Sequence, residues 1–133
     1  MYRNSANRVI LVGHIGNEPT MNTIANDRKV SHFSLASNFG WRTPKGEYKD
    51  RTDWHRIVCW GNLADYSCKI AKGQQVYVEG SLRTREWLDK ENKKHYVTEV
   101  YADMLTPLGK RKDKDQEGAE AKPDEKTGEE VPF

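Results

Sequence analysis

Two indoles and one guanidinium occur within one short segment of the chain, residues 54–61 (WHRIVCWG). The first seven residues suit a β-strand, in which side chains alternate between two faces. Trp54, Arg56 and Trp60 would then point the same way, together with Val58. Flat rings beside a cation can stack on nucleic-acid bases and contact phosphates. Buried Trp and Val are also common and an Arg stem can pack, so this segment alone leaves a core face equally open.

Cys59 and His55 in the same segment invite a second interpretation, a nucleophile and its base. They share the other face of the predicted strand, but four residues at strand rise separate them by roughly 13 Å, beyond hydrogen-bond reach. The two cysteines and four histidines lack the paired spacing of a zinc site, and no glycine-rich phosphate loop is present. We therefore expect no enzyme, no metal and no cofactor. Hydrolysis of labelled single-stranded DNA (ssDNA) with added divalent metal would reveal the alternative, an enzyme acting on nucleic acid.

The other two tryptophans also occur among basic residues. Trp41 lies in residues 39–51, where a Thr-Pro-Lys-Gly turn signal predicts an aromatic, basic loop. Trp87 lies in residues 75–88, where Arg83 and Arg85 alternate onto the same face as the indole. This recurrence favours an exposed aromatic face over a core.

A mostly β structure has to position these residues. Alternating or β-branched patterns predict strands at residues 8–16, 30–38, 52–60, 75–88 and 95–101. Helical spacing occurs over residues 62–73, where Asn62 could cap the start and Gly73 the end. The order of three strands, one short helix and two strands predicts an all-β, five-stranded OB-fold barrel, whose usual ligands are oligonucleotides or oligosaccharides.

Size and charge set further bounds on the function. The 133 residues suffice for one domain, and 22 Lys and Arg nearly balance 20 Asp and Glu. Residues 1–109 nevertheless carry 16 basic against 12 acidic side chains, which favours a polyanionic partner. Two cysteines make no disulfide framework, and no apolar run reaches the length of a signal peptide core or a membrane span. We expect a cytoplasmic protein without a membrane partner.

The composition changes after residue 109. Residues 110–130 contain no Leu, Ile, Val, Phe, Tyr or Trp. Such a segment cannot bury enough apolar surface to fold, so we expect residues 110–128 to be a disordered charged linker. Residues 129–133 (EEVPF) then place apolar side chains behind an acidic pair. This tip suits docking on a partner protein, and an ordinary solvated terminus is the alternative.

Four segments resemble the bacterial single-stranded DNA-binding proteins in their order and spacing. They are residues 7–13 (NRVILVG), 52–58 (TDWHRIV), 73–80 (GQQVYVEG) and 82–87 (LRTREW). The resemblance covers nearly all of residues 1–109, which would form the OB-fold domain. It implies sequence-independent binding and protection of ssDNA during replication, recombination and repair, in the bacterial nucleoid.

The resemblance also implies roles for individual residues. Base stacking would fall to the four tryptophans of the chain, Trp41, Trp54, Trp60 and Trp87. Trp60 stands where many relatives have Phe. Contacts to the ssDNA backbone are expected first from Arg56, Arg83 and Arg85, and more weakly from Arg3, Arg8, Lys45, Lys49 and Lys72. Each of these lysines could equally be a solvated surface charge.

Assembly and partners follow from the same resemblance. The family is typically homotetrameric with its first strand pairing between subunits, so the expected interface residues are His55, Val9 and Leu11. Docking of replication, recombination and repair proteins would fall to Glu129, Glu130, Val131, Pro132 and Phe133. Relatives usually carry an Asp-rich run before Ile-Pro-Phe or Leu-Pro-Phe and a longer linker, which implies weaker docking and shorter reach here. An OB module that prefers RNA or a protein ligand is a further alternative, distinguishable by competition with ssDNA of equal length.

Overall fold

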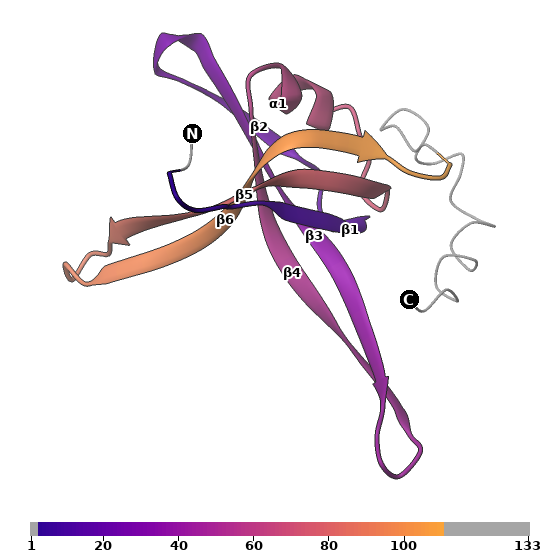
Figure 1. Cartoon of the computed structure of the whole chain (residues 1–133). Coiled ribbons are helices and arrows are strands. Elements are labelled where there is room, and N and C mark those ends of the chain that lie inside the picture. The colour runs from indigo at the N-terminus through magenta and orange to yellow at the C-terminus, as the bar shows by residue number, and fades with distance from the viewer. Residues whose placement is uncertain (1–2, 111–133) are drawn as a thin grey trace.

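The computed structural model describes residues 3–110 of the chain. Eight elements follow one another along these residues (Figure 1). They are β1 (Val9–Ile15), β2 (Thr20–Ile24), the 3-10 turn η1 (Ala25–Asp27), β3 (Arg28–Arg42), β4 (Tyr48–Trp60), α1 (Asn62–Ser67), β5 (Gln75–Leu88) and β6 (Lys94–Pro107). The predicted linker and docking tip lie outside the described residues, except for Lys110 at the start of that linker.

Five of the strands close into a barrel. The sheet runs in the order β1-β5-β6-β4-β3-β2, and β3 also pairs with β1, so that β2 is an addition on the outer edge of β3. All pairings are antiparallel except β4 with β6, where Ile57 is opposite Val100. The predicted all-β, five-stranded OB-type barrel is confirmed, with the short helix between the third and fourth barrel strands.

The core lies inside the barrel and beneath α1. It gathers the alternate apolar side chains of the strands with two residues from the helical connection, and its fully buried members are Leu35, Ile57, Cys59, Ala64, Ile70, Val76 and Val78. Gly13 is required where the barrel closes, because a Cβ at this position would collide with the backbone carbonyl of Ala36 on β3. Cys59 thus lies on an inward face, but Val58, predicted on the same face as Trp54 and Trp60, is buried as well.

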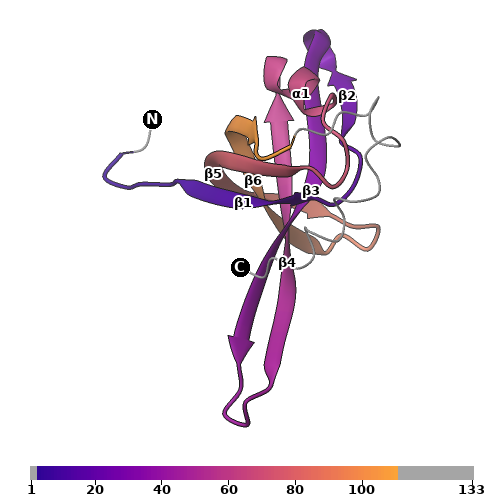
Figure 2. The ribbon, with the colours of Figure 1, turned by 90° about the vertical axis from the view of Figure 1, so that its right-hand side faces the viewer.

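Two hairpins extend beyond the barrel as arms (Figures 1 and 2). We call residues 38–52 the β3–β4 arm and residues 84–97 the β5–β6 arm. The predicted loop over residues 39–51 is wrong, because β3 continues to Arg42, β4 begins at Tyr48, and only residues 43–47 turn. Gly46 allows that turn with a φ of 89°. The arm was missed because nearly all its residues are exposed, which leaves no alternation of apolar and polar side chains to recognise.

The remaining differences concern β2, α1 and β6. The five residues of β2 are all exposed, so the sequence has no alternation of buried and exposed side chains that would predict this strand. The helix is also shorter than predicted: α1 ends at Ser67, and Asn62 is its first residue, preceded by Gly61 at the N-cap position without a side-chain capping bond. Strand β6 continues past Tyr101 to Pro107 by pairing with β5.

Candidate nucleic-acid interface

A row of two aromatic rings flanked by two cations crosses one face of the barrel. The rings of Trp60 on β4 and Tyr101 on β6 lie 6.4 Å apart. The guanidinium of Arg28 lies 4.8 Å from the Trp60 ring centre, and that of Arg83 lies 5.2 Å from the Tyr101 ring centre. Strand pairing explains the row, because Val58 is opposite Tyr101 and strand alternation places Trp60 on the same face as Val58. The row presents stacking surface and positive charge side by side.

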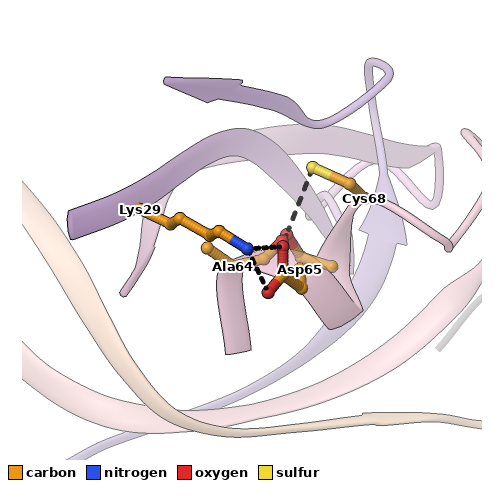
Figure 3. A network of polar contacts seen from close by, with 5 residues as sticks. Lys29, Ala64, Asp65 and Cys68 are labelled. Atoms are coloured by element: carbon orange, nitrogen blue, oxygen red, sulfur yellow. Dashed lines mark hydrogen bonds and ion pairs between the residues drawn. The ribbon is translucent and has the colours of Figure 1, made fainter. Parts of the chain in front are cut away.

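The start of β3 is held against the helix, which fixes Arg28 beside Trp60. Lys29 donates from Nζ to both carboxylate oxygens of Asp65 on α1, at 3.2 and 3.1 Å (Figure 3). A hollow of about 410 Å³ opens beside Trp60, and its lining includes Arg28 and Asn62. This hollow is a second place at which a flat group could approach the Trp60 ring.

A buried carboxylate organises the centre of the same face. Glu99 on β6 is 2% exposed. Its Oε2 lies 2.8 Å from Arg56 Nε, and its Oε1 accepts a hydrogen bond from Arg85 Nε at 3.1 Å. The side chains of both arginines are about half exposed. One carboxylate therefore orients two guanidiniums, which together keep a net positive charge and spare N–H donors for an anionic ligand.

The electrostatics of this cluster are visible in two neighbouring groups. Hydrogen bonding and charge from Glu99 raise the pKa of Arg85 above its ordinary value. Burial, and then the positive charge of Arg56, lower the pKa of His32. His32 therefore stays neutral to lower pH than an exposed histidine, so the positive charge of the face comes from arginine.

Trp54 and Trp87 flank this centre. Trp54 is 62% exposed, and its ring lies against Gly16, where a Cβ would collide with the indole. Trp87 on β5 stacks on His95 of β6, with ring centres 4.5 Å apart and planes inclined by 20°. Arg56 and Arg85 both contact Glu99, so strand alternation puts Trp54 and Trp87 on the same face as these arginines. We call this face the tryptophan face, and it comprises Trp54, Arg56, Trp60, Arg85 and Trp87.

The β3–β4 arm carries a separate aromatic group. Trp41 stacks on Phe39 with ring centres 5.9 Å apart, and the guanidinium of Arg51 lies 5.8 Å from the Phe39 ring centre. Trp54 on β4 is opposite Ala36 of β3, so it shares a face with the even-numbered residues of β3. Trp41 and Phe39 are odd-numbered residues of β3. By alternation Trp41 thus belongs to the other side of the β3–β4 ribbon. The aromatic surface extends onto the arm, but it does not continue as a flat sheet face.

Comparison with known proteins identifies the family. The model of the single-strand binding protein family matches residues 6–108. The chain belongs to this family. It is 44% identical over 105 residues to Single-stranded DNA-binding protein 1 of Chlorobaculum tepidum, an alignment that covers 77% of this chain and 65% of that protein. The chain thus spans slightly less than two thirds of the length of this relative.

A solved structure agrees with this assignment. The match is described as a Plasmodium falciparum SSB complex with ssDNA, and it has a TM-score of 0.72 at 38% identity. It covers 82% of this chain and 100% of the other. Family membership indicates a binding protein and not an enzyme.

The two side chains considered for nucleophilic chemistry, Cys59 and His55, each have a defined environment in this single-strand binding domain. Cys59 is fully buried, and burial raises the pKa of its thiol to about 12. The Nε2 atom of His55 lies 2.8 Å from the Oγ atom of Ser37.

Within residues 3–110, no helix is long and apolar enough to cross a membrane.

Several residues expected to bind ssDNA lie away from the tryptophan face of the single-strand binding domain. Arg8, which immediately precedes β1, pairs with Glu79 of β5. Lys45 and Lys49 belong to the β3–β4 arm, and Lys72 follows the helical segment with its side chain exposed. Arg3 precedes β1. The structure therefore brings Arg56, Arg83 and Arg85 together but not these five.

The expected interface residues of β1 point toward the barrel. Val9 and Leu11 pack against the core, whereas Ile10 and Val12 on the same strand are 56% and 45% exposed. Alternation along the seven residues of β1 accounts for the difference. The outward side of β1 therefore presents Ile10 and Val12 to any partner.

Three residues of the site were missed from the sequence: Arg28, Glu99 and Tyr101. Arg28 lies outside the strand predicted at residues 30–38, although it is two residues before Val30 and so on the same face of the extended strand β3. Glu99 and Tyr101 fall at alternate positions of the last predicted strand, which was a usable signal. Their partners could not be read from the sequence, because the parallel pairing of β4 with β6 joins distant segments.

Proposed function

We propose that the protein binds ssDNA without sequence preference and protects it. One observation carries this proposal: Glu99 fixes Arg56 and Arg85 between exposed tryptophans on a single barrel face. Single strands expose phosphates and unpaired bases together, and this face offers cations and rings together. The complex with ssDNA named for the similar Plasmodium falciparum structure supports the same ligand.

The geometry supports a role for each of these residues. Bases stack on Trp54, Trp60 and Trp87, each contributing roughly 1–3 kcal/mol, and any base serves because every base has a flat π surface. Phosphates contact Arg56, Arg83 and Arg85. Arg28 joins these contacts because it already lies over the Trp60 ring. Trp41 extends the path onto the β3–β4 arm, together with Lys45 and Lys49.

Titration with oligothymidylate tests this function. Binding should quench the intrinsic tryptophan fluorescence, and Trp54→Ala should weaken affinity by about tenfold or more, as the loss of one stacked base requires. The logarithm of the binding constant should fall linearly with the logarithm of salt concentration, because phosphate contacts release counterions. An affinity that does not change with salt, or with Trp54→Ala, would refute the proposal. Tighter binding to RNA than to ssDNA of the same length would point to an RNA-binding module instead.

Arg8→Gln shows how far the ssDNA path extends. Arg8 immediately precedes β1 and pairs with Glu79 of β5. An unchanged salt dependence in this variant would confine the path to the tryptophan face and the β3–β4 arm. A shallower dependence would place DNA on the β1 side as well.

We also propose that the C-terminal tip, residues 129–133, recruits replication, recombination and repair proteins. Its sequence supports this role, because an acidic pair precedes Val131, Pro132 and Phe133 at the terminus. Removal of Pro132 and Phe133 should leave ssDNA affinity intact and abolish capture of such partners. Capture that survives the truncation would refute the docking role.

Self-association as a homotetramer is the third part of the proposal. Exposed apolar side chains on β1 support it, since Ile10 and Val12 remain in solvent in the single chain. His55, Val9 and Leu11 stay proposed as contributors to the subunit contact. The mass of the native assembly tests the stoichiometry.

A further inference from the structure

The tip of the β5–β6 arm is built around one carboxylate. Asp89 Oδ1 accepts hydrogen bonds from the backbone N–H groups of Glu91 and Lys93, at 2.8 and 2.9 Å. The backbone N–H of Asp89 in turn donates to the Lys93 carbonyl at 3.1 Å. Asn92 completes the turn with a φ of 64°, in the left-handed region that Asn tolerates. One carboxylate oxygen therefore accepts two of the backbone hydrogen bonds that close the turn.

The second oxygen of Asp89 has a different partner. Oδ2 lies 2.8 Å from Nε2 of His95, a residue of β6 that lies opposite Trp87 in the sheet register. The hydrogen bond from His95 is the largest cause that lowers the pKa of Asp89, followed by the backbone bond from Lys93. The carboxylate thus stays ionised over the physiological range. His95 is held from its edge by this bond while its ring plane remains available for contact.

The ring plane of His95 lies against Trp87. The two rings are 4.5 Å apart at their centres and inclined by 20°, so the imidazole covers one face of the indole. Trp87 is still 46% exposed. The turn, the imidazole and the indole therefore form one connected series on a two-stranded arm outside the barrel core (Figure 1).

We propose that Asp89 and His95 are positioning residues for Trp87. They hold the indole in one orientation, with one face against His95 and the other face open, so that it forms a preformed platform for a base. The inference rests on the proposed ssDNA function and adds to it. An indole on an exposed arm otherwise loses side-chain freedom when a base binds, and this loss lowers affinity. His95 confines the indole before binding, and Asp89 confines His95.

Three variants of the full chain separate ring contact from hydrogen bonding. His95→Gln removes the ring but keeps an N–H donor for Asp89, whereas His95→Phe keeps a flat ring without that donor. Trp87→Ala removes the platform itself. Affinity for a fluorescein-labelled oligothymidylate should fall by about two- to tenfold in His95→Gln, the range expected for losing one aromatic pair. It should fall less, but measurably, in His95→Phe, whose ring can still stack on Trp87 but is no longer held by Asp89. Wild-type affinity in His95→Phe would exclude a positioning role for Asp89.

A double-mutant cycle identifies the route of the effect. His95→Gln should cause no further loss of affinity in the Trp87→Ala background, because His95 acts through Trp87. An equal loss in both backgrounds would show direct contact between His95 and DNA and would overturn the inference. Wild-type affinity in His95→Gln, or in Trp87→Ala, would also overturn it.

A measurement without DNA keeps this inference separate from the proposed function. Acrylamide quenching of Trp87 is obtained by subtracting the signal of a Trp87→Phe counterpart from that of each protein. Quenching should increase in His95→Gln, because the second face of the indole becomes accessible. If wild-type protein fails to bind oligothymidylate, the proposed function is wrong. Unchanged quenching of Trp87 instead overturns the positioning role, whether or not DNA binds.

Discussion

Glu99 is the residue on which the electrostatics of the tryptophan face depend. Its side chain is almost fully buried, yet the two arginines that it holds are about half exposed. An acidic group at a surface for polyanions is counterproductive unless it arranges the cations that make the contacts. The geometry favours this interpretation, because Arg56 and Arg85 come from different strands and both contact this carboxylate.

Glu99→Gln should therefore have opposite effects on stability and on salt dependence. Losing the charged hydrogen bonds should lower the free energy of unfolding by about 1–2 kcal/mol, a value reduced because both guanidiniums are solvated. One more uncompensated cation should steepen the salt dependence of ssDNA binding by about 0.7 in logarithmic slope. Urea unfolding and salt titrations measure the two quantities.

Glu79→Gln is the matched control for this experiment. Glu79 also pairs with an arginine, Arg8, but on the outer side of β1 and β5. Its salt slope should match that of the wild type. A Glu99→Gln slope that also matches the wild type would contradict the role given to Glu99.

Cys59 provides a second test at the residue scale. Burial raises the pKa of its thiol from 9.0 to about 12, so the folded protein keeps it protonated at pH 8. Cys68 is only partly buried. A maleimide should label Cys68 in the native protein, and label Cys59 only after unfolding. In a Cys68→Ser variant, rapid native labelling at pH 8 would contradict the assignment.

The same thiol gives a pH dependence with a definite sign. Its pKa is higher in the folded than in the unfolded state, so its contribution to stability is complete below about pH 9 and is lost as pH rises toward 12. Urea midpoints across this range should fall less in a Cys59→Ala variant than in the wild type. Equal slopes in both proteins would show that the thiol is not responsible.

At the scale of elements, the sequence predicted what the barrel buries and missed what pairing alone creates. Strands with one buried face, such as residues 52–60, show alternation and were placed correctly. Strand β2 and both sides of the β3–β4 arm are exposed, so their structure depends on cross-strand hydrogen bonds that leave no apolar pattern. The site residues followed the same rule: Trp54 and Arg56 were found on a barrel strand, whereas Arg28 was missed because it lies outside the strand predicted at residues 30–38.

The position of Trp41 predicts a dependence on DNA length. Trp41 lies on the arm and on the other side of the ribbon from Trp54, so a strand must pass beyond the barrel face to reach it. Trp54→Ala should weaken binding of short and long oligothymidylates alike. Trp41→Ala should weaken only the long ones, by about 1–3 kcal/mol. Equal losses at every length would place Trp41 on the barrel path.

At the scale of the whole molecule, two surfaces of different character share the barrel. The tryptophan face is built from β4, β5 and β6, while the outward side of β1 and β5 presents Ile10 beside Glu79, with Met104 of β6 next in the row. Ile10 and Met104 are 56% and 49% exposed. A sheet face that exposes aliphatic side chains and lacks the stacked rings is suited to contact with a second copy of the chain.

Ile10→Glu should separate self-association from folding. The side chain is already half exposed, so the charge should change the free energy of unfolding by only about 0.5 kcal/mol. Across a contact between copies, the same charge is unpaired and strongly unfavourable, so the native mass should fall. Leu88→Glu is the control, because Leu88 is equally exposed, at 58%, but lies at the end of β5 on the β5–β6 arm.

A separated domain offers one tryptophan face where an assembly offers several, so Ile10→Glu should weaken binding of long oligothymidylates far more than of short ones. An unchanged mass in Ile10→Glu would move the contact elsewhere on the barrel and leave this aliphatic row without a role.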